Sequence, residues 1–205
     1  MGHEISKDRC AEAVIKGIEK AQKKYEKWSG GDWLWAASEY KITVHVAEAL
    51  ANIDGAKFVT LEHSGLDAME VAAAVVPGPK PKKARLRGRF DILFWWGDET
   101  PRAIVEIKNQ PNGSEQCSKD FHRICEVLKI NKEESSLQFG LFGFYTSATS
   151  GDRKSAEEKI EDKFCSIKEL AKTCTGSTCK IKLFKSKIHC YEGNDAWAAG
   201  CLLFT

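Results

Sequence analysis

Residues 89–111 read RFDILFWWGDETPRAIVEIKNQP, and this stretch is the most informative part of the chain. Two runs rich in β-branched and aromatic residues, 90–96 and 102–108, flank a Gly-Asp-Glu-Thr-Pro turn, a pattern typical of a β-hairpin. Apolar residues occupy both faces of these runs, which predicts a central pair of strands covered on both sides.

Three charged residues fall on one face of this hairpin. Side chains alternate along a strand, so Asp91 shares a face with Leu93, and Glu106 shares a face with Lys108. Because the turn is centred near residues 98–99, two carboxylates and an ammonium converge at one end of the hairpin. Burying such groups is costly unless they pair or hold a metal, so the cluster is a predicted functional site. The alternative is a solvated polar face with weak Glu–Lys pairs.

This pattern resembles the PD-(D/E)xK nuclease superfamily, whose core carries an Asp near the start of one strand and Glu-x-Lys on the next. The matching residues are Asp91 and Glu106-Ile107-Lys108, and the superfamily's order of helix, hairpin, helix and strand spans residues 32–147. Gly-Arg-Phe-Asp stands where the name-giving Pro-Asp would be. The resemblance implies an α/β, restriction-endonuclease-like three-layer fold with a central mixed β-sheet flanked by helices.

The rest of the chain shows alternating helical and strand-like patterns. The expected helices are 4–27, 32–53 with Asp32 as N-cap, 66–76, 115–130 and 153–173, and the expected further strands are 57–62, 138–146, 180–191 and 196–204. This order predicts a single domain over residues 1–205. Its core would span 32–147, preceded by the helix 4–27 and followed by a helix and strands over 153–204.

The residues of the motif are of the types that metal-dependent phosphodiester hydrolysis needs. Mg²⁺ (or Mn²⁺) prefers oxygen ligands, which Asp91, Glu106 and the carbonyl of Ile107 can supply. A metal-bound water, made more acidic, would attack the phosphorus. Lys108 would orient that water or neutralise charge on the phosphate.

One acidic residue upstream also falls among apolar positions. The helix predicted over 32–53 places Glu39 on the same stripe as Trp35, Ile42 and Val46. In the superfamily the first core helix often supplies an acid to the metal cluster, and Glu39 is the position that fits. Glu48 and Glu62 are the alternatives to Glu39.

Basic residues precede the hairpin in a run that contains no acid. The run comprises Lys80, Lys82, Lys83, Arg85, Arg87 and Arg89. Such a run is either a solvated loop or a phosphate-binding segment, and the net charge of +2 does not decide between them. In the helix 115–130 we expect Arg123 on the exposed face with His122 and Lys119, where its bidentate geometry suits phosphate. The candidate nucleic-acid-binding residues are therefore Lys82, Lys83, Arg85, Arg87 and Arg123.

The sequence predicts a cytoplasmic protein with no membrane partner. No segment approaches the roughly 20 apolar residues that cross a bilayer, and the N-terminus is charged from Glu4 onward. Eight irregularly spaced cysteines are expected to be reduced thiols. The alternative is a zinc site drawn from Cys174, Cys179, His189, Cys190 and Cys201.

Together with the resemblance, the sequence predicts a Mg²⁺- or Mn²⁺-dependent nuclease. The resemblance favours DNA over RNA as its substrate, and a homodimer is compatible with it because many superfamily members dimerise to cut both strands. One alternative is a non-catalytic nucleic-acid-binding or assembly subunit with the same fold. Another is a small interaction protein in which the hairpin is only structural. Endonuclease and exonuclease action are both open at this point.

Overall fold

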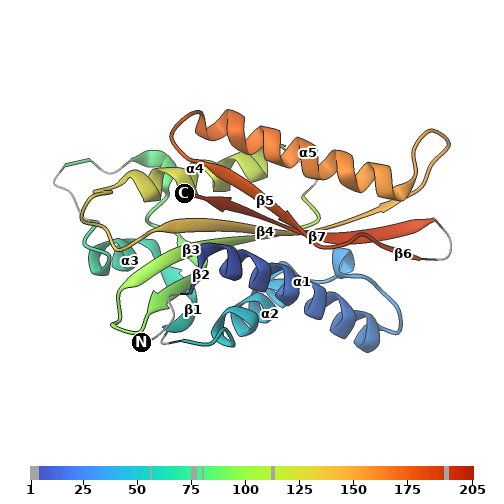
Figure 1. The fold of residues 1–205 in the computed structure, drawn as a ribbon, viewed down its shortest axis with the longest axis horizontal. Helices are drawn as coiled ribbons and strands as arrows, with labels where there is room; N and C mark the ends of the chain where they lie inside the picture. The colour runs from blue at the N-terminus through green and yellow to red at the C-terminus, as the bar shows by residue number, and fades with distance from the viewer. Residues whose placement is uncertain (1–4, 56, 75–77, 80, 112–113, 192–193) are drawn as a thin grey trace.

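In the part of the chain that the structure describes, a seven-stranded mixed sheet lies between two layers of helices (Figure 1). The structure is a computed structural model that describes residues 5–205 apart from 56, 75–77, 80, 112–113 and 192–193. The strands are β1 (Lys57–Ser64), β2 (Arg89–Trp96), β3 (Pro101–Asn109), β4 (Phe139–Thr149), β5 (Ile181–Lys185), β6 (His189–Tyr191) and β7 (Asp195–Phe204). The helices are α1 (Lys7–Ser29), α2 (Glu39–Ala51), α3 (Gly65–Val71), α4 (Ser114–Lys129) and α5 (Ala156–Thr175), with short 3₁₀ helices η1 (Leu34–Ala36) and η2 (Lys82–Ala84).

The sheet has the strand order β1-β2-β3-β4-β7-β5, and β6 also pairs with β7. Strands β3 and β4 are parallel, whereas the other described pairs are antiparallel. The chain crosses between the two parallel strands through α4, because parallel neighbours need a long connection. The predicted α/β class, with a central mixed sheet flanked by helices, is therefore confirmed.

Each face of the sheet has its own hydrophobic core. Helices α1 and α2 pack against the face that carries Ile92, Val105 and Ile107. Helices α3, α4 and α5 cover the opposite face, which carries Leu93 and Ile104. The hairpin is thus buried on both sides, as its sequence predicts.

Two glycines on the central strand β4 let both helical layers come close. A Cβ at Gly140 would lie 2.3 Å from Cγ2 of Ile124 on α4, and one at Gly143 would lie 2.6 Å from Cγ1 of Val14 on α1. Carbon atoms do not pack at such distances, so a larger residue would push the helix away. The spacing between α4 and the sheet is therefore set by the absence of a side chain at Gly140.

The predicted start of the helix over 32–53 is wrong. It divides into η1 and α2, and α2 begins only at Glu39. Ser38, rather than Asp32, is the N-cap, since its hydroxyl accepts a hydrogen bond from the Tyr40 amide at 3.3 Å. Trp35 lies in η1 with 60% of its surface exposed, so it does not share the buried stripe of α2.

Several other boundaries differ from the prediction for local reasons. Helix α1 continues to Ser29 because Gly30 provides a left-handed C-cap. Helix α5 starts after Ser155, which forms a capping box with Glu158. Helix α3 ends at Val71, earlier than the expected residue 76, which lies outside the described residues. The run 180–191 forms two strands that pair with different parts of β7.

The cysteines proposed as a zinc site do not come together. Cys179 lies in the core beneath α4 and α5, and Cys201 lies in the core beneath α1 and α2. The sheet separates these two thiols. Over the described residues, no helix combines the length and apolar composition needed to cross a bilayer.

Candidate active site

Strands β2 and β3 separate at the end where Asp91 and Glu106 lie. Backbone pairing between the two strands extends as far as Ile92 and Val105. Beyond that pair, the side chain of Asp91 takes the place of a backbone acceptor from β2. Its Oδ2 accepts a hydrogen bond from the Ile107 amide at 2.7 Å. Because the N–H and C=O of one strand residue point to the same side, the Ile107 carbonyl also faces the gap beside Asp91.

Glu106 is buried and held by an arginine from α4. Its Oε1 accepts a hydrogen bond from Nη1 of Arg123 at 2.8 Å, and the same nitrogen donates to the Arg89 carbonyl at 2.7 Å. Burial raises the pKa of Glu106 well above its ordinary value, an effect that Arg123 opposes and the negative charge of Asp91 reinforces. Burial likewise raises the pKa of Asp91.

Lys108 completes the cluster between two further acids. Its Nζ lies 3.2 Å from Oε1 of Glu39 and 3.5 Å from Oδ2 of Asp120. Burial disfavours the charged ammonium, but the carboxylates of Asp120 and Glu39 outweigh that effect and raise the pKa of Lys108. The side chain therefore carries a positive charge at neutral pH.

Glu39 reaches the motif because it is the first residue of α2. Its second oxygen, Oε2, accepts a hydrogen bond from the Asn109 amide at 2.9 Å. Glu39 was predicted as a metal ligand, but here both of its oxygens contact the end of β3. The two alternatives lie elsewhere: Glu48 pairs with Lys20 at 2.9 Å, and Glu62 is exposed.

Asp120 on α4 belongs to the cluster, and the sequence analysis missed it. Only 5% of the residue is exposed, and its Oδ1 accepts a hydrogen bond from Nη1 of Arg85 at 3.1 Å. Its Oδ2 is buried and makes the 3.5 Å ion pair with Lys108, but no hydrogen bond to any described residue. The signal was available, because Asp120 interrupts the apolar stripe that includes Cys117, Phe121 and Ile124. The same signal had identified Glu39.

Arg123 was expected on the exposed face of its helix, and that prediction is wrong. The residue is 2% exposed, with its guanidinium against Glu106 and 4.3 Å from the centre of the Phe90 ring. It therefore presents no surface to a phosphate in this structure. Lys119 is exposed as expected, and His122 is half-buried.

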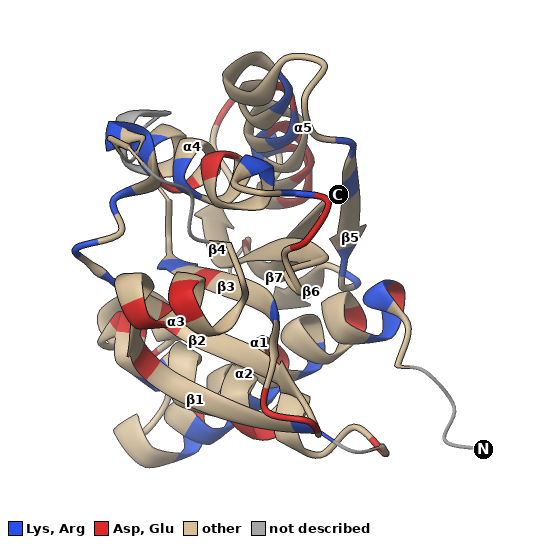
Figure 2. Ribbon diagram, turned by 90° about the vertical axis from the view of Figure 1, so that its left-hand side faces the viewer, with Lys and Arg blue, Asp and Glu red and all other residues tan. Residues whose placement is uncertain are grey.

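The basic segment 82–89 precedes β2, and its Arg85 pairs with Asp120 of the cluster at 3.1 Å. Lysines and arginines are coloured blue along the ribbon in Figure 2. Ala84 and Leu86 anchor it in the core, which leaves the alternating cations exposed. The predicted nucleic-acid-binding residues Lys82, Lys83, Arg85 and Arg87 are all among these exposed cations. A cavity of about 660 Å³ is lined by Lys82, Arg85 and Arg87 together with Leu66, Pro81 and Leu86. Lys80 lies outside the described residues.

The donor set at the cluster suits a divalent cation that takes few protein ligands. Among the residues that the structure describes, no three His, Cys, Asp or Glu side chains form a ready group for a metal ion. Mg²⁺, however, is usually held by one or two carboxylates together with waters and substrate phosphates. Asp91, Glu106 and the Ile107 carbonyl offer such oxygens. Burial raises the pKa of both Asp91 and Glu106, and the charge of Asp91 adds to the effect at Glu106, so these are groups whose charge a cation would balance.

No protein-family model matches the sequence, and no curated protein or solved structure is significantly similar to it. Conclusions about function therefore rest on the residues and their geometry.

Proposed function

We propose that this protein is a metal-dependent nuclease with a restriction-endonuclease-like fold and a PD-(D/E)xK active site. The observation that carries the proposal is the convergence of Asp91, Glu106 and Lys108 where β2 and β3 separate. The Asp91 carboxylate spans the gap to the Ile107 amide at 2.7 Å. Purely structural packing does not require two acids and an amine at one buried point, because their desolvation is costly.

Each residue of the cluster has a role in this proposal. Asp91, Glu106 and the Ile107 carbonyl would hold Mg²⁺ or Mn²⁺. The bound cation would lower the pKa of a coordinated water and draw charge from a phosphate oxygen. Lys108, which Asp120 and Glu39 keep protonated, would orient the attacking water or offset charge on the phosphate.

The exposed cations beside the cluster support a polyanionic substrate. Arg85 is linked to the site through Asp120, so the segment 82–89 would bring phosphate-binding charge next to the reacting atoms. Contacts of lysine and arginine with phosphates supply most of the affinity in sequence-independent binding. The preference for DNA over RNA comes from the resemblance alone.

The test is cleavage of plasmid and linear DNA by the purified protein with Mg²⁺, with Mn²⁺ and with EDTA. We expect cleavage with either metal and none with EDTA. Asp91→Asn and Lys108→Ala should each abolish cleavage. The matched controls Glu48→Gln and Lys20→Ala change an acid and an amine that pair with each other away from the cluster, at 2.9 Å. Cleavage that survives both site substitutions would rule out this active site.

A second candidate is a nucleic-acid-binding subunit of the same fold that does not cleave. Two observations favour it. The Glu106 carboxylate is hydrogen-bonded to Arg123, and no three acidic, histidine or cysteine side chains among the described residues form a group that could hold a metal ion. Salt-sensitive DNA binding without cleavage in either metal would select this candidate.

A further inference from the structure

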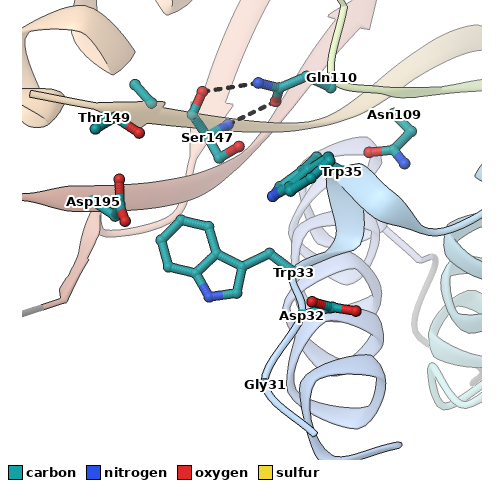
Figure 3. A pocket seen from close by; sticks show the side chains of 10 residues that line it. Gly31, Asp32, Trp33, Trp35, Asn109, Gln110, Ser147, Thr149 and Asp195 are labelled. Atoms are coloured by element: carbon teal, nitrogen blue, oxygen red, sulfur yellow. Dashed lines mark hydrogen bonds between the residues drawn. The ribbon is translucent and has the colours of Figure 1, made fainter. Parts of the chain in front are cut away.

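A second cavity, of about 800 Å³, opens where β3 and β4 end. Trp33 and Trp35 from the segment before α2 line one side, and Ser147, Thr149 and Asp195 line the other (Figure 3). Asn109 and Gln110, the two residues after Lys108, form part of its wall. Ligands commonly bind outside the carboxyl ends of parallel strands, where this cavity lies.

The tryptophan-bearing segment is fixed in place by hydrogen bonds to Gln22 and Asn109. The Leu34 amide donates to Oε1 of the fully buried Gln22 at 2.8 Å. Nδ2 of Asn109 donates to the carbonyls of Leu34 at 2.6 Å and Ala37 at 2.9 Å. This wall is therefore formed before any ligand binds, which lowers the entropy lost on binding.

The opposite wall is held in the same way. The Gln110 side chain donates to the Ser147 carbonyl at 2.9 Å and accepts from the Ser147 amide at 2.7 Å (Figure 3). Asn109 also connects the cavity to the cluster, because its backbone amide donates to Glu39 at 2.9 Å. The two sites are thus parts of one rigid strand end.

The lining selects a flat, uncharged group that carries hydrogen-bond donors. Trp35 keeps 60% of its surface exposed, which leaves a large apolar face unburied. Indole rings stack well on nucleobases whatever their sequence. Asp32 and Asp195 also line the cavity, and their carboxylates would repel a phosphate while accepting hydrogen bonds from base amino groups.

We infer that this cavity holds an unpaired nucleobase next to the phosphate bound at the cluster, an inference that rests on the proposed nuclease function for its substrate class. Lys108 and Gln110 are two residues apart in the chain and so at most about 7 Å apart, which brings both sites within reach of adjacent parts of one strand of nucleic acid. A base can enter the cavity only when it is not paired. The substrate is therefore single-stranded or locally unpaired nucleic acid.

The test is binding of a short labelled oligonucleotide, measured by fluorescence anisotropy in EDTA so that no cleavage occurs. The single strand, its duplex and an abasic version of the single strand are compared. We expect the single strand to bind more tightly than the other two. Trp35→Ala should weaken its binding about tenfold. Trp28→Ala is the matched control, because Trp28 is 63% exposed on α1 and does not line the cavity. Its affinity should equal that of the wild type.

The inference is overturned if Trp35→Ala binds like Trp28→Ala, or if the abasic strand binds as well as the normal one. It is also overturned if Trp35→Ala weakens the binding of a trimethyllysine peptide but not the binding of the oligonucleotide. Cleavage of the same oligonucleotides with Mn²⁺ separates the two proposals. Trp35-dependent binding without any cleavage supports the cavity and contradicts the nuclease. Cleavage that is unaffected by Trp35→Ala, together with unaffected binding, contradicts the cavity and leaves the nuclease standing.

Discussion

The guanidinium of Arg123 lies 2.8 Å from the carboxylate of Glu106, and neither residue has more than 3% of its surface exposed. Arg123 thus restrains one of the two acids proposed to bind the cation. A buried pair of this kind contributes little net stability, but the removal of one partner leaves an isolated charge.

Arg123→Met should therefore destabilise the protein by about 3–5 kcal/mol, because Glu106 would be left buried without its cation. Urea unfolding followed by circular dichroism measures this change. Glu106→Gln should cost a similar amount, whereas the double variant should recover much of the loss. Additive losses in the double variant would show that the two side chains do not form a coupled pair.

Stability should fall as pH rises through the range in which Asp91 and Glu106 ionise. Burial raises both pKa values above the ordinary 3.8 and 4.5, so in this window the folded protein binds more protons than the unfolded chain. The stability that these groups contribute is complete below their unfolded pKa values and is lost as pH rises through their folded values. Melting temperatures recorded from acid to neutral pH measure this trend, and Asp91→Asn should flatten it.

Mg²⁺ should reverse this loss. A cation binds the ionised carboxylates, so its stabilising effect should increase with pH and disappear in Asp91→Asn. Melting curves with and without Mg²⁺ at each pH provide the comparison. An equal shift at all pH values, or the same shift in Asp91→Asn, would mean that the cation binds elsewhere.

Asp120 should act as a positioning residue for Lys108. Asp120→Asn removes one of the three carboxylate charges that raise the pKa of Lys108, so the alkaline limb of the activity profile should move to lower pH. The cleavage rate should fall about tenfold to a hundredfold because the ammonium of Lys108 would no longer be held in position. Glu126→Gln is the control, since Glu126 lies on the same helix and pairs with the exposed Lys129 at 2.8 Å. A purely structural role would lower stability without moving the pH profile.

The exposed cations of the segment 82–89 should set the salt dependence of nucleic-acid binding. Lys83→Ala and Arg87→Ala should each reduce the slope of log affinity against log salt by about one, with weaker binding to all sequences. Lys23→Ala, on α1 across the sheet, should leave the slope unchanged. If all three variants keep the slope of the wild type, the phosphate contacts lie on another surface.

The sequence was sufficient to predict the hairpin and its three charged residues. The alternation of side chains along a strand depends only on the local chain, and the turn between the strands sets how they align. Asp91, Glu106 and Lys108 could therefore be assigned to one face before the fold was known. Glu39 could be found because a charge among apolar positions requires a partner, even though its helix starts seven residues later than predicted.

The partners of these residues could not be predicted in the same way. Helical periodicity alone assigned Arg123 to the wrong face, because the rotation of α4 is set by the residues beneath it on the sheet. Strands β4, β5 and β6 all pair with β7, although β4 lies far from β7 in the sequence, and no local pattern reveals that pairing. The tryptophan cavity depends on side chains from four separate segments.

The missing side chain at Gly140 has a consequence for the chemistry. Ile124, which fills the space above it, follows Arg123 directly and lies one turn after Asp120 on α4. A single methyl group at position 140 would act as a wedge beneath this helix and lift both charged residues from their partners on β3. A change at an apolar position outside the cluster would thus disrupt the proposed active site while its polar groups stay intact.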